Sequence, residues 1–291
     1  MIYIREKSVS VQNRGAPVHS KAITSVAFHP TRDICVSASL DGLIKVWAPN
    51  SASSSSSSSG SSASSSSNYD VASSFRSSVS GSEVTGLSMH PLGDYAVSSN
   101  KDASWSFSDL NVGRVLATFS SIPPSSETYE NIRLHPDGLL VAMGTSSHLI
   151  KIFDLRSGEK AASFSGHNGP IRTISFGENG FSLASGSNDG ARLWDLRKQE
   201  CTRLIPLENS TSCSSVVFDE SSQYVAIGGS SGRISLVDMR AAVSDLLSTA
   251  IVASISAHKG SVTGLSWLGS SAKTLVSTSL DGSLAHYGAA I

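Results

Sequence analysis

The sequence predicts an all-β fold, a β-propeller with six full blades, and three observations support that prediction. The chain repeats one pattern six times, in which a strand, a polar turn and a closing strand follow one another. Within each copy, apolar residues alternate with small or polar ones, as they do in half-buried strands. Glycine and proline fall between the strands, where tight turns need them. The copies are 19–47, 81–107, 127–154, 166–195, 211–238 and 257–287.

The spacing of the copies indicates how large each blade is. Aligned on the residue of the second turn, successive copies lie 61, 45, 42, 42 and 50 residues apart. A period of about 40 to 45 residues is typical of the four-stranded WD repeat. The Gly-His and Trp-Asp pairs of that repeat are intact at 166–167 and 194–195. Because one blade cannot bury both of its faces, several must stack to form a core. The aligned turn residues are Asp41, Asp102, Ser147, Asp189, Ser231 and Asp281.

Strands can be assigned within the copies from these patterns. Val26 and Phe28 belong to a first strand, 183–187 to a second and 45–47 to a third. The turns between first and second strands contain His-Pro or Gly-rich segments such as 90–94. Three histidines precede proline at this turn and are interpreted as turn residues: His29, His90 and His135.

The two ends of the chain leave the closure of the propeller open. Residues 1–18 contain two candidate strands, 2–5 and 8–13, which resemble the last two strands of an incomplete blade. The sixth copy ends after its third strand, at 288–291. Either 8–13 supplies the missing fourth strand of a six-bladed ring, or the ring has seven blades and one is partial. We therefore assign 1–18 to a partial first blade or closing strand and 19–291 to the propeller.

A serine-rich insertion interrupts the first copy after its third strand. Residues 51–67 contain only Ser, Ala and Gly. Such a segment buries too little apolar surface to offset the entropy lost on ordering, so we expect it to be disordered. Long surface insertions are tolerated because the cost of closing a loop grows slowly with its length. Phosphorylation of these serines is an alternative role, and a passive expansion is the simpler interpretation.

Composition excludes several classes of protein. A chain of 291 residues with 39% hydrophobic residues is long enough for one large β domain. Its formal net charge of -1 lacks the excess of Lys and Arg that phosphate binding requires, so no direct contact with nucleic acid is expected. No apolar run approaches the roughly 18 residues of a membrane span, and residues 1–7 are too short for a signal peptide. We expect a soluble intracellular protein.

No cofactor, metal or catalytic residue is predicted. The cysteines are far apart and form no CxxC pair, which favours reduced thiols packed among strands over a disulfide or a zinc site. No histidine pair has metal-ligand spacing, and the GxxxxGKS, HExxH and GxSxG motifs are absent from the sequence. The cysteines are Cys35, Cys201 and Cys213.

One constellation imitates a catalytic triad but recurs with the blades. A catalytic site occurs once, whereas His, Ser, Asp and Trp return at matching positions in several copies. Buried polar groups must pair, so a repeated set of this kind predicts a structural network. WD-repeat proteins, which this pattern resembles, lock each blade with such a tetrad. Its predicted members are His19, Ser39, Asp41 and Trp47, then His167, Ser187, Asp189 and Trp194, and in the sixth copy His258 and Asp281.

The remaining copies depart from this tetrad. Copies three and five carry Ser147 and Ser231 at the Asp position, with Phe153 and Val237 at the Trp position. We expect these two blades to hold together mainly by apolar packing. The fourth copy is one residue short before its tryptophan, which leaves the geometry of its tetrad open.

Three long segments, 90–116, 135–198 and 216–229, resemble one family over nearly the whole chain. They are similar to the C-terminal propeller of the pre-mRNA-processing factor nineteen family, and the most specific part is Trp-Ser-Phe-Ser-Asp at 105–109. The full-length members of that family have a U-box, a coiled coil that tetramerises, and a seven-bladed propeller that docks partners. This sequence contains neither a U-box nor a heptad run. The resemblance implies a nuclear protein linked to splicing, DNA repair and ubiquitin transfer.

Two main functions follow from these observations. The first is a non-catalytic docking propeller whose partners are spliceosomal nineteen-complex proteins or ubiquitination substrates. The alternative is the substrate-recognition part of a U-box ubiquitin ligase whose catalytic half is missing here. A generic WD-repeat scaffold is a third interpretation. Loops that enter the first strands are expected to present charged and aromatic side chains to a partner at one mouth of the ring. These candidates are Lys21, Glu83, Tyr129, Asn168, Arg172 and Lys259.

Overall fold

The computed structural model describes residues 18–49, 69–120, 127–208, 211–240, 251–268 and 274–288. Regular structure in these residues is almost entirely β-strand, arranged in six antiparallel sheets. Each sheet has the consecutive strand order of a propeller blade, so the predicted fold class, an all-β propeller with six blades, is confirmed. The strands predicted at 2–5 and 8–13, and the serine-rich insertion at 51–67, lie outside the described residues. The chain divides into two compact units, which we call the N-terminal unit (18–120) and the C-terminal unit (127–288).

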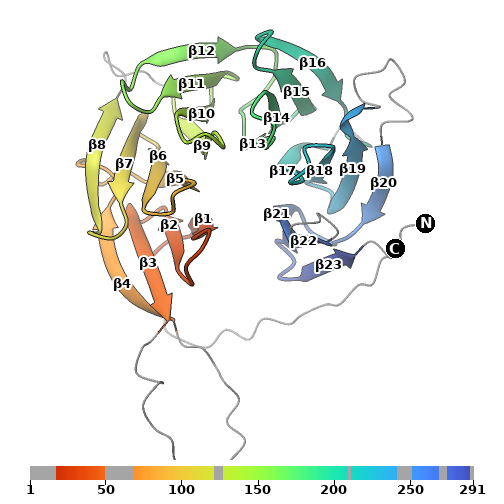
Figure 1. The fold of residues 1–291 in the computed structure, drawn as a ribbon. Helices are drawn as coiled ribbons and strands as arrows, with labels where there is room; N and C mark the ends of the chain where they lie inside the picture. The colour runs from red at the N-terminus through yellow and green to blue at the C-terminus, as the bar shows by residue number, and fades with distance from the viewer. Residues whose placement is uncertain are drawn as a thin grey trace, which may run out of the picture. The chain divides into compact units, whose positions relative to one another are not determined.

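The N-terminal unit contains two four-stranded sheets (Figure 1). Alternation explains the strands: Ile44 and Val46 are buried, whereas Lys45 between them is only half-buried. The first sheet consists of β1 (Ile23–Phe28), β2 (Cys35–Ser39), β3 (Leu43–Pro49) and β4 (Tyr69–Arg76). The second consists of β5 (Val84–Met89), β6 (Tyr95–Asn100), β7 (Ser104–Asp109) and β8 (Arg114–Ser120).

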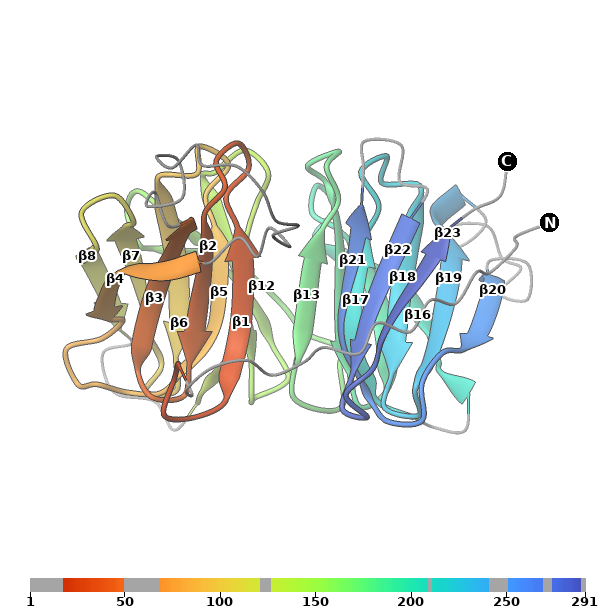
Figure 2. The same ribbon diagram turned by 90° about the horizontal axis from the view of Figure 1, so that it is seen from below.

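The C-terminal unit contains the other four sheets. The first strands of three of them, β13, β17 and β21, lie side by side in both views (Figures 1 and 2). The third sheet consists of β9 (Tyr129–Leu134), β10 (Leu140–Thr145), β11 (Ile150–Asp154) and β12 (Lys160–Phe164). The fourth consists of β13 (Thr173–Phe176), β14 (Ser182–Ser187), β15 (Gly190–Asp195) and β16 (Glu200–Ile205). The fifth consists of β17 (Cys213–Phe218), β18 (Tyr224–Gly229), β19 (Arg233–Asp238) and β20 (Ile251–Ser256). The sixth has three strands among the described residues: β21 (Val262–Leu268), β22 (Thr274–Ser279) and β23 (Leu284–Gly288).

A β-bulge recurs at the start of the pairing between first and second strands. The register shifts there in five of the six described sheets. In four of them the bulged residue is Thr or Ser, namely Thr24, Thr85, Ser214 and Thr263. The hydroxyl then returns to the second strand: Ser214 Oγ donates to Gly228 O at 3.1 Å. The side chain replaces the ladder hydrogen bond that the bulge removes.

The core of each unit lies between successive sheets, and the second strands are its most buried elements. All six residues of β14 are buried. Glycine in these strands makes room for a side chain of the next sheet. A Cβ added at Gly144 would lie 2.8 Å from Ile171 Cγ2, and one added at Gly228 would lie 2.6 Å from Val262 Cγ1. Gly186 faces Cys213 in the same way. Only glycine permits such close approach.

The three cysteines are free thiols. Cys213 is fully buried, and burial raises the pKa of its thiol to about 12. No helix among the residues that the structure describes has the length and apolar character needed to cross a bilayer.

Candidate functional site

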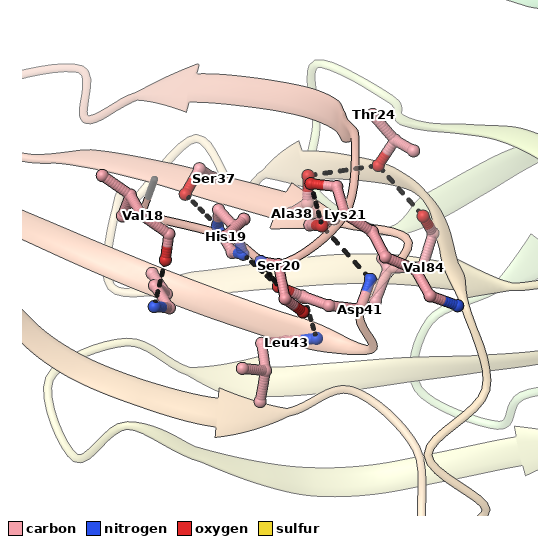
Figure 3. A network of polar contacts seen from close by, with 12 residues as sticks. Val18, His19, Ser20, Lys21, Thr24, Ser37, Ala38, Asp41, Leu43 and Val84 are labelled. Atoms are coloured by element: carbon pink, nitrogen blue, oxygen red, sulfur yellow. Dashed lines mark hydrogen bonds and ion pairs between the residues drawn. The ribbon is translucent and has the colours of Figure 1, made fainter. Parts of the chain in front are cut away.

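In the first sheet, two side chains, His19 and Trp47, meet at one serine oxygen, Ser37 Oγ. His19 Nε2 lies 2.8 Å from Ser37 Oγ, and Trp47 Nε1 donates to the same oxygen at 2.9 Å. The other ring nitrogen, His19 Nδ1, lies 2.9 Å from Asp41 Oδ2. Figure 3 shows His19 held between Ser37 and Asp41. The structure therefore brings His19, Asp41 and Trp47 together, as the sequence predicts, but through a serine that was not predicted.

The fourth sheet repeats this geometry around Ser185. Trp194 Nε1 donates to Ser185 Oγ at 2.8 Å, and His167 lies 2.7 Å from Ser185 Oγ and 2.5 Å from Asp189 Oδ1. The Asp189 carboxylate can only accept, so Nδ1 of His167 carries the hydrogen of that contact. In the neutral ring Nε2 is then an acceptor, and it receives the hydroxyl proton of Ser185. The network therefore selects one neutral tautomer of His167.

The charges of the network agree with that assignment. Burial lowers the pKa of His167 below its ordinary value, more than the neighbouring Asp189 raises it, which favours the neutral ring. Burial alone would raise the pKa of Asp189, but hydrogen bonds and charge from His167 and Arg192 outweigh it and lower that pKa. The pair is thus a neutral imidazole beside a carboxylate.

The prediction of Ser39 and Ser187 as members of the tetrads is wrong. Ser39 Oγ donates to Lys21 O at 3.2 Å, and Ser187 Oγ has no hydrogen-bond partner in the described part of the chain. The reason is register: Trp47 pairs with Cys35, so Ser37 is two residues away from that pair and Ser39 is four. At about 3.3 Å per residue, the indole reaches only the nearer serine.

The fourth copy keeps its tetrad although it is one residue short. Ser187 pairs directly with Gly190, so only Asn188 and Asp189 form the turn. Gly190 has a φ of 115°, a backbone conformation that residues with a side chain rarely adopt. The turn of this hairpin is therefore shorter by the missing residue, and Asp189 still lies beside His167.

Other sheets build substitutes for the tetrad. In the sixth, His258 lies 2.6 Å from both Ser277 Oγ and Ser283 Oγ, and Ser283 Oγ donates to Asp281 Oδ1 at 2.5 Å. Ser283 thus relays the contact, because His258 Nδ1 and Asp281 Oδ1 are 3.8 Å apart. In the second sheet, Ser77 occupies the place of the histidine and lies 2.7 Å from Ser98 Oγ.

The third and fifth sheets differ from each other. Val237 is fully buried in an apolar cluster, as expected for the fifth. In the third, Phe153 packs edge-on against Tyr129, with ring centroids 6.4 Å apart. That sheet also has a polar network, in which Glu127 accepts hydrogen bonds from Ser147 and Lys151. Apolar packing alone therefore does not describe the third sheet.

The networks are unsuited to nucleophilic catalysis. Ser185 is completely buried, and its oxygen is engaged by both Trp194 and His167, so a substrate has no access to it. Among the residues that the structure describes, no group of three or more His, Cys, Asp or Glu side chains is arranged to hold a metal ion. The recurrent His-Ser-Asp-Trp sets are part of the architecture.

The histidines of the His-Pro turns do more than terminate a strand. His29 Nδ1 accepts hydrogen bonds from the backbone N–H groups of Thr31 and Arg32, as expected for a turn residue. His135 Nε2, however, donates to Gly180 O of the next sheet at 2.8 Å. The prediction for His135 was therefore incomplete, because its ring also joins successive sheets.

The predicted partner-binding residues fall into three groups. In the N-terminal unit, Glu83 is 3.0 Å from Lys21 Nζ and 2.9 Å from Lys101 Nζ, and hydrogen bonds from Lys101 and then Lys21 lower its pKa. Tyr129 is only 1% exposed because it begins β9 and does not lie in the preceding loop. Its prediction as a partner contact is therefore wrong. The side chains of Asn168, Arg172 and Lys259 are exposed on the C-terminal unit.

Comparison with known proteins places these features in a class. The family model described as "WD domain, G-beta repeat" matches residues 13–48, 158–195 and 249–287. Together with the blade order and the His-Ser-Asp-Trp networks, this match defines the chain as a WD-repeat protein.

The resemblance to one family within that class is confirmed over most of the chain. The chain is 36% identical over 270 residues to "Pre-mRNA-processing factor 19" of Bos taurus and of Homo sapiens, which is 92% of this chain and 48% of each relative. It is 35% identical over 217 residues to "Pre-mRNA-processing factor 19" of Oryza sativa subsp. japonica, which is 74% of this chain and 38% of the relative. The chain therefore spans less than half the length of these relatives.

Proposed function

We propose that this chain is a non-catalytic docking module for proteins of the pre-mRNA splicing machinery and that it acts in the nucleus. The observation that carries the proposal is the 36% identity to proteins named Pre-mRNA-processing factor 19 over 92% of the chain. The buried networks support the non-catalytic part, since Ser37 and Ser185 serve Trp and His side chains of their own sheets. Binding then belongs to exposed loops carried on a rigid scaffold.

Arg172 and Lys259 are the strongest candidates for contact with a partner on the C-terminal unit. Each lies just before a first strand, β13 or β21, and each uses its backbone N–H internally while its side chain remains exposed. The Arg172 N–H donates to Gly186 O, and the Lys259 N–H donates to Asp281 Oδ2 at 2.8 Å. The backbone at both positions is already held by hydrogen bonds, so binding of a partner need not order it.

The proposal is tested by affinity purification of the tagged chain from nuclear extract, followed by mass spectrometry. We expect co-purification of splicing proteins and reduced recovery with the double variant Arg172→Glu, Lys259→Glu. Arg156→Glu with Lys160→Glu is the matched control, because it reverses two exposed cations at the β11–β12 turn. Failure of the unmodified chain to capture any splicing protein would refute the docking function. Equal capture by the double variant would remove this surface from consideration.

The second candidate is the substrate-recognition part of a U-box ubiquitin ligase, which the family resemblance suggests. The chain matches 48% of the length of the Bos taurus and Homo sapiens relatives, so the activity of such a whole protein enters here only as a proposal. The same purification separates the two functions. Capture of ubiquitin-modified clients without splicing proteins would support the second candidate.

A further inference from the structure

A hollow of about 590 Å³ opens in the C-terminal unit where β13, β17 and β21 end. These three strands lie side by side (Figures 1 and 2), so residues from three successive sheets line one space. Phe176, Phe218 and Trp267 supply its aromatic wall. Glu178 and Glu220 are at its edge, on the loops that follow β13 and β17.

The described residues that line the hollow carry only negative charge. Among the residues that the structure describes, its lining includes the three carboxyl groups of Glu178, Asp219 and Glu220 and no Lys, Arg or His. Asp219 serves the fold, because it accepts the Tyr224 N–H at 2.8 Å and a hydrogen bond from Ser221. Glu178 and Glu220 are exposed, and neither forms an ion pair with another described residue. Two carboxylates are therefore available to a cation.

Two of the three aromatic side chains are fixed by contacts with other residues of the core. The ring of His135 contacts Phe176 edge-on, with centroids 5.0 Å apart and planes at 82°. Phe218 is 6% exposed and packs in a core cluster formed by the fourth and fifth sheets. Trp267 Nε1 is buried but has no acceptor within the described part of the chain. The hollow thus combines aromatic rings that are fixed by packing with two carboxylates that form no ion pair among the described residues.

We propose that this hollow binds an arginine side chain of a partner protein segment. A planar guanidinium has enough donors to contact Glu178 and Glu220 together while its face rests on an aromatic ring. The chain already contains one such pair, since the Arg197 guanidinium lies 4.0 Å above the Phe181 ring. The negative lining disfavours nucleic acid, whose phosphates would be repelled. This inference rests on the proposed docking function and specifies its chemistry.

The test is a titration of the complete chain with a short Gly/Ser peptide that carries one central arginine, followed by ligand-observed NMR. Citrulline in place of arginine gives a neutral peptide of the same shape. We expect the citrulline peptide, and each of the variants Glu178→Gln and Glu220→Gln, to bind about fivefold to tenfold more weakly, as the loss of a charge-assisted hydrogen bond implies. Glu159→Gln is the matched control, because Glu159 is exposed but does not line the hollow.

Equal affinity for the arginine and citrulline peptides, or unchanged binding by both glutamine variants, would overturn the inference. Because Glu178 and Glu220 are exposed, their variants should unfold at the same temperature as the unmodified chain, which makes a loss of binding specific. Absence of peptide binding in a chain that still captures splicing proteins would refute this inference alone. Peptide binding without capture of any splicing protein would refute the docking function and leave the chemistry of the hollow intact.

Discussion

In the first and fourth sheets, one serine hydroxyl oxygen is the centre of the buried hydrogen-bond network. Ser37 Oγ and Ser185 Oγ each accept an indole N–H and lie within 2.8 Å of a histidine nitrogen. Removing such an oxygen leaves a buried donor and a buried acceptor without partners, which costs more than the loss of one exposed hydrogen bond. The neighbouring Ser187 is also completely buried, but its oxygen has no partner in the described residues.

This contrast gives a prediction with a built-in control. Ser185→Ala should lower the free energy of unfolding by about 1 to 3 kcal/mol, because it leaves Trp194 Nε1 and His167 Nε2 unpaired. Ser187→Ala should change it by no more than about 0.5 kcal/mol. Urea denaturation followed by tryptophan fluorescence measures both. Equal destabilisation by the two variants would contradict the network centred on Ser185.

At the scale of elements, glycine and a neighbouring side chain set the distance between sheets. Gly228 in β18 faces Val262 at the start of β21, and a Cβ there would lie 2.6 Å from Val262 Cγ1. The next residue, Gly229, has ordinary space, since its nearest atom would be 3.5 Å away. Two adjacent glycines in one strand therefore have different roles.

Gly228→Ala should destabilise the protein by about 1 to 3 kcal/mol through overpacking. Gly229→Ala should stay within about 1 kcal/mol, because its φ is not in the left-handed region and no atom is crowded. Adding Val262→Ala to Gly228→Ala should recover part of the loss, so the double-mutant cycle should show coupling. Thermal or urea unfolding of the four proteins measures this. Strict additivity would show that the two residues do not determine the spacing.

Much of the fold follows from the sequence because period and turn chemistry are local properties. The copies, the alternation in strands such as β3 and the turn glycines all lie within short windows. The choice between Ser37 and Ser39 does not, because both serines lie on the same face of β2 and only their depth relative to Trp47 separates them. The hollow also escapes prediction: Glu178, Glu220 and Trp267 come from three copies, and their aromatic neighbours have the pattern of ordinary strand residues.

At the scale of the whole molecule, the pairing of β3 with β4 bears on the serine-rich insertion. Pro49 and Tyr69 are direct cross-strand partners, so the chain leaves and re-enters the sheet at adjacent points. Cross-strand neighbours are about 5 Å apart, which a two-residue hairpin spans. Deleting 51–67 would join Asn50 to Asn68 as such a hairpin, and Asn tolerates the positive φ that these turns require.

We expect deletion of 51–67 to leave both the urea midpoint and the recovery of partners in the nuclear-extract assay unchanged. The m value, which is the slope of the unfolding free energy against urea concentration, should also stay constant, because the segment contains no apolar side chain larger than alanine. A deletion of equal length within the first sheet, such as one that includes β2, serves as the disruptive control. Loss of partner recovery with an unchanged midpoint would assign the insertion a specific role in binding.

The glycine contacts between sheets also restrict how the order of blades can change. Gly144 receives Ile171, Gly186 receives Cys213 and Gly228 receives Val262, so three junctions use the same recess for side chains of three different volumes. If a sheet were moved to another position, the space at its glycine would receive a side chain of a different volume. That space would then be underpacked or overpacked. Each sheet therefore packs best against the sheet that follows it in the sequence. Exchange of blades between positions should carry a packing penalty, and substitutions at these junctions should be inherited in pairs.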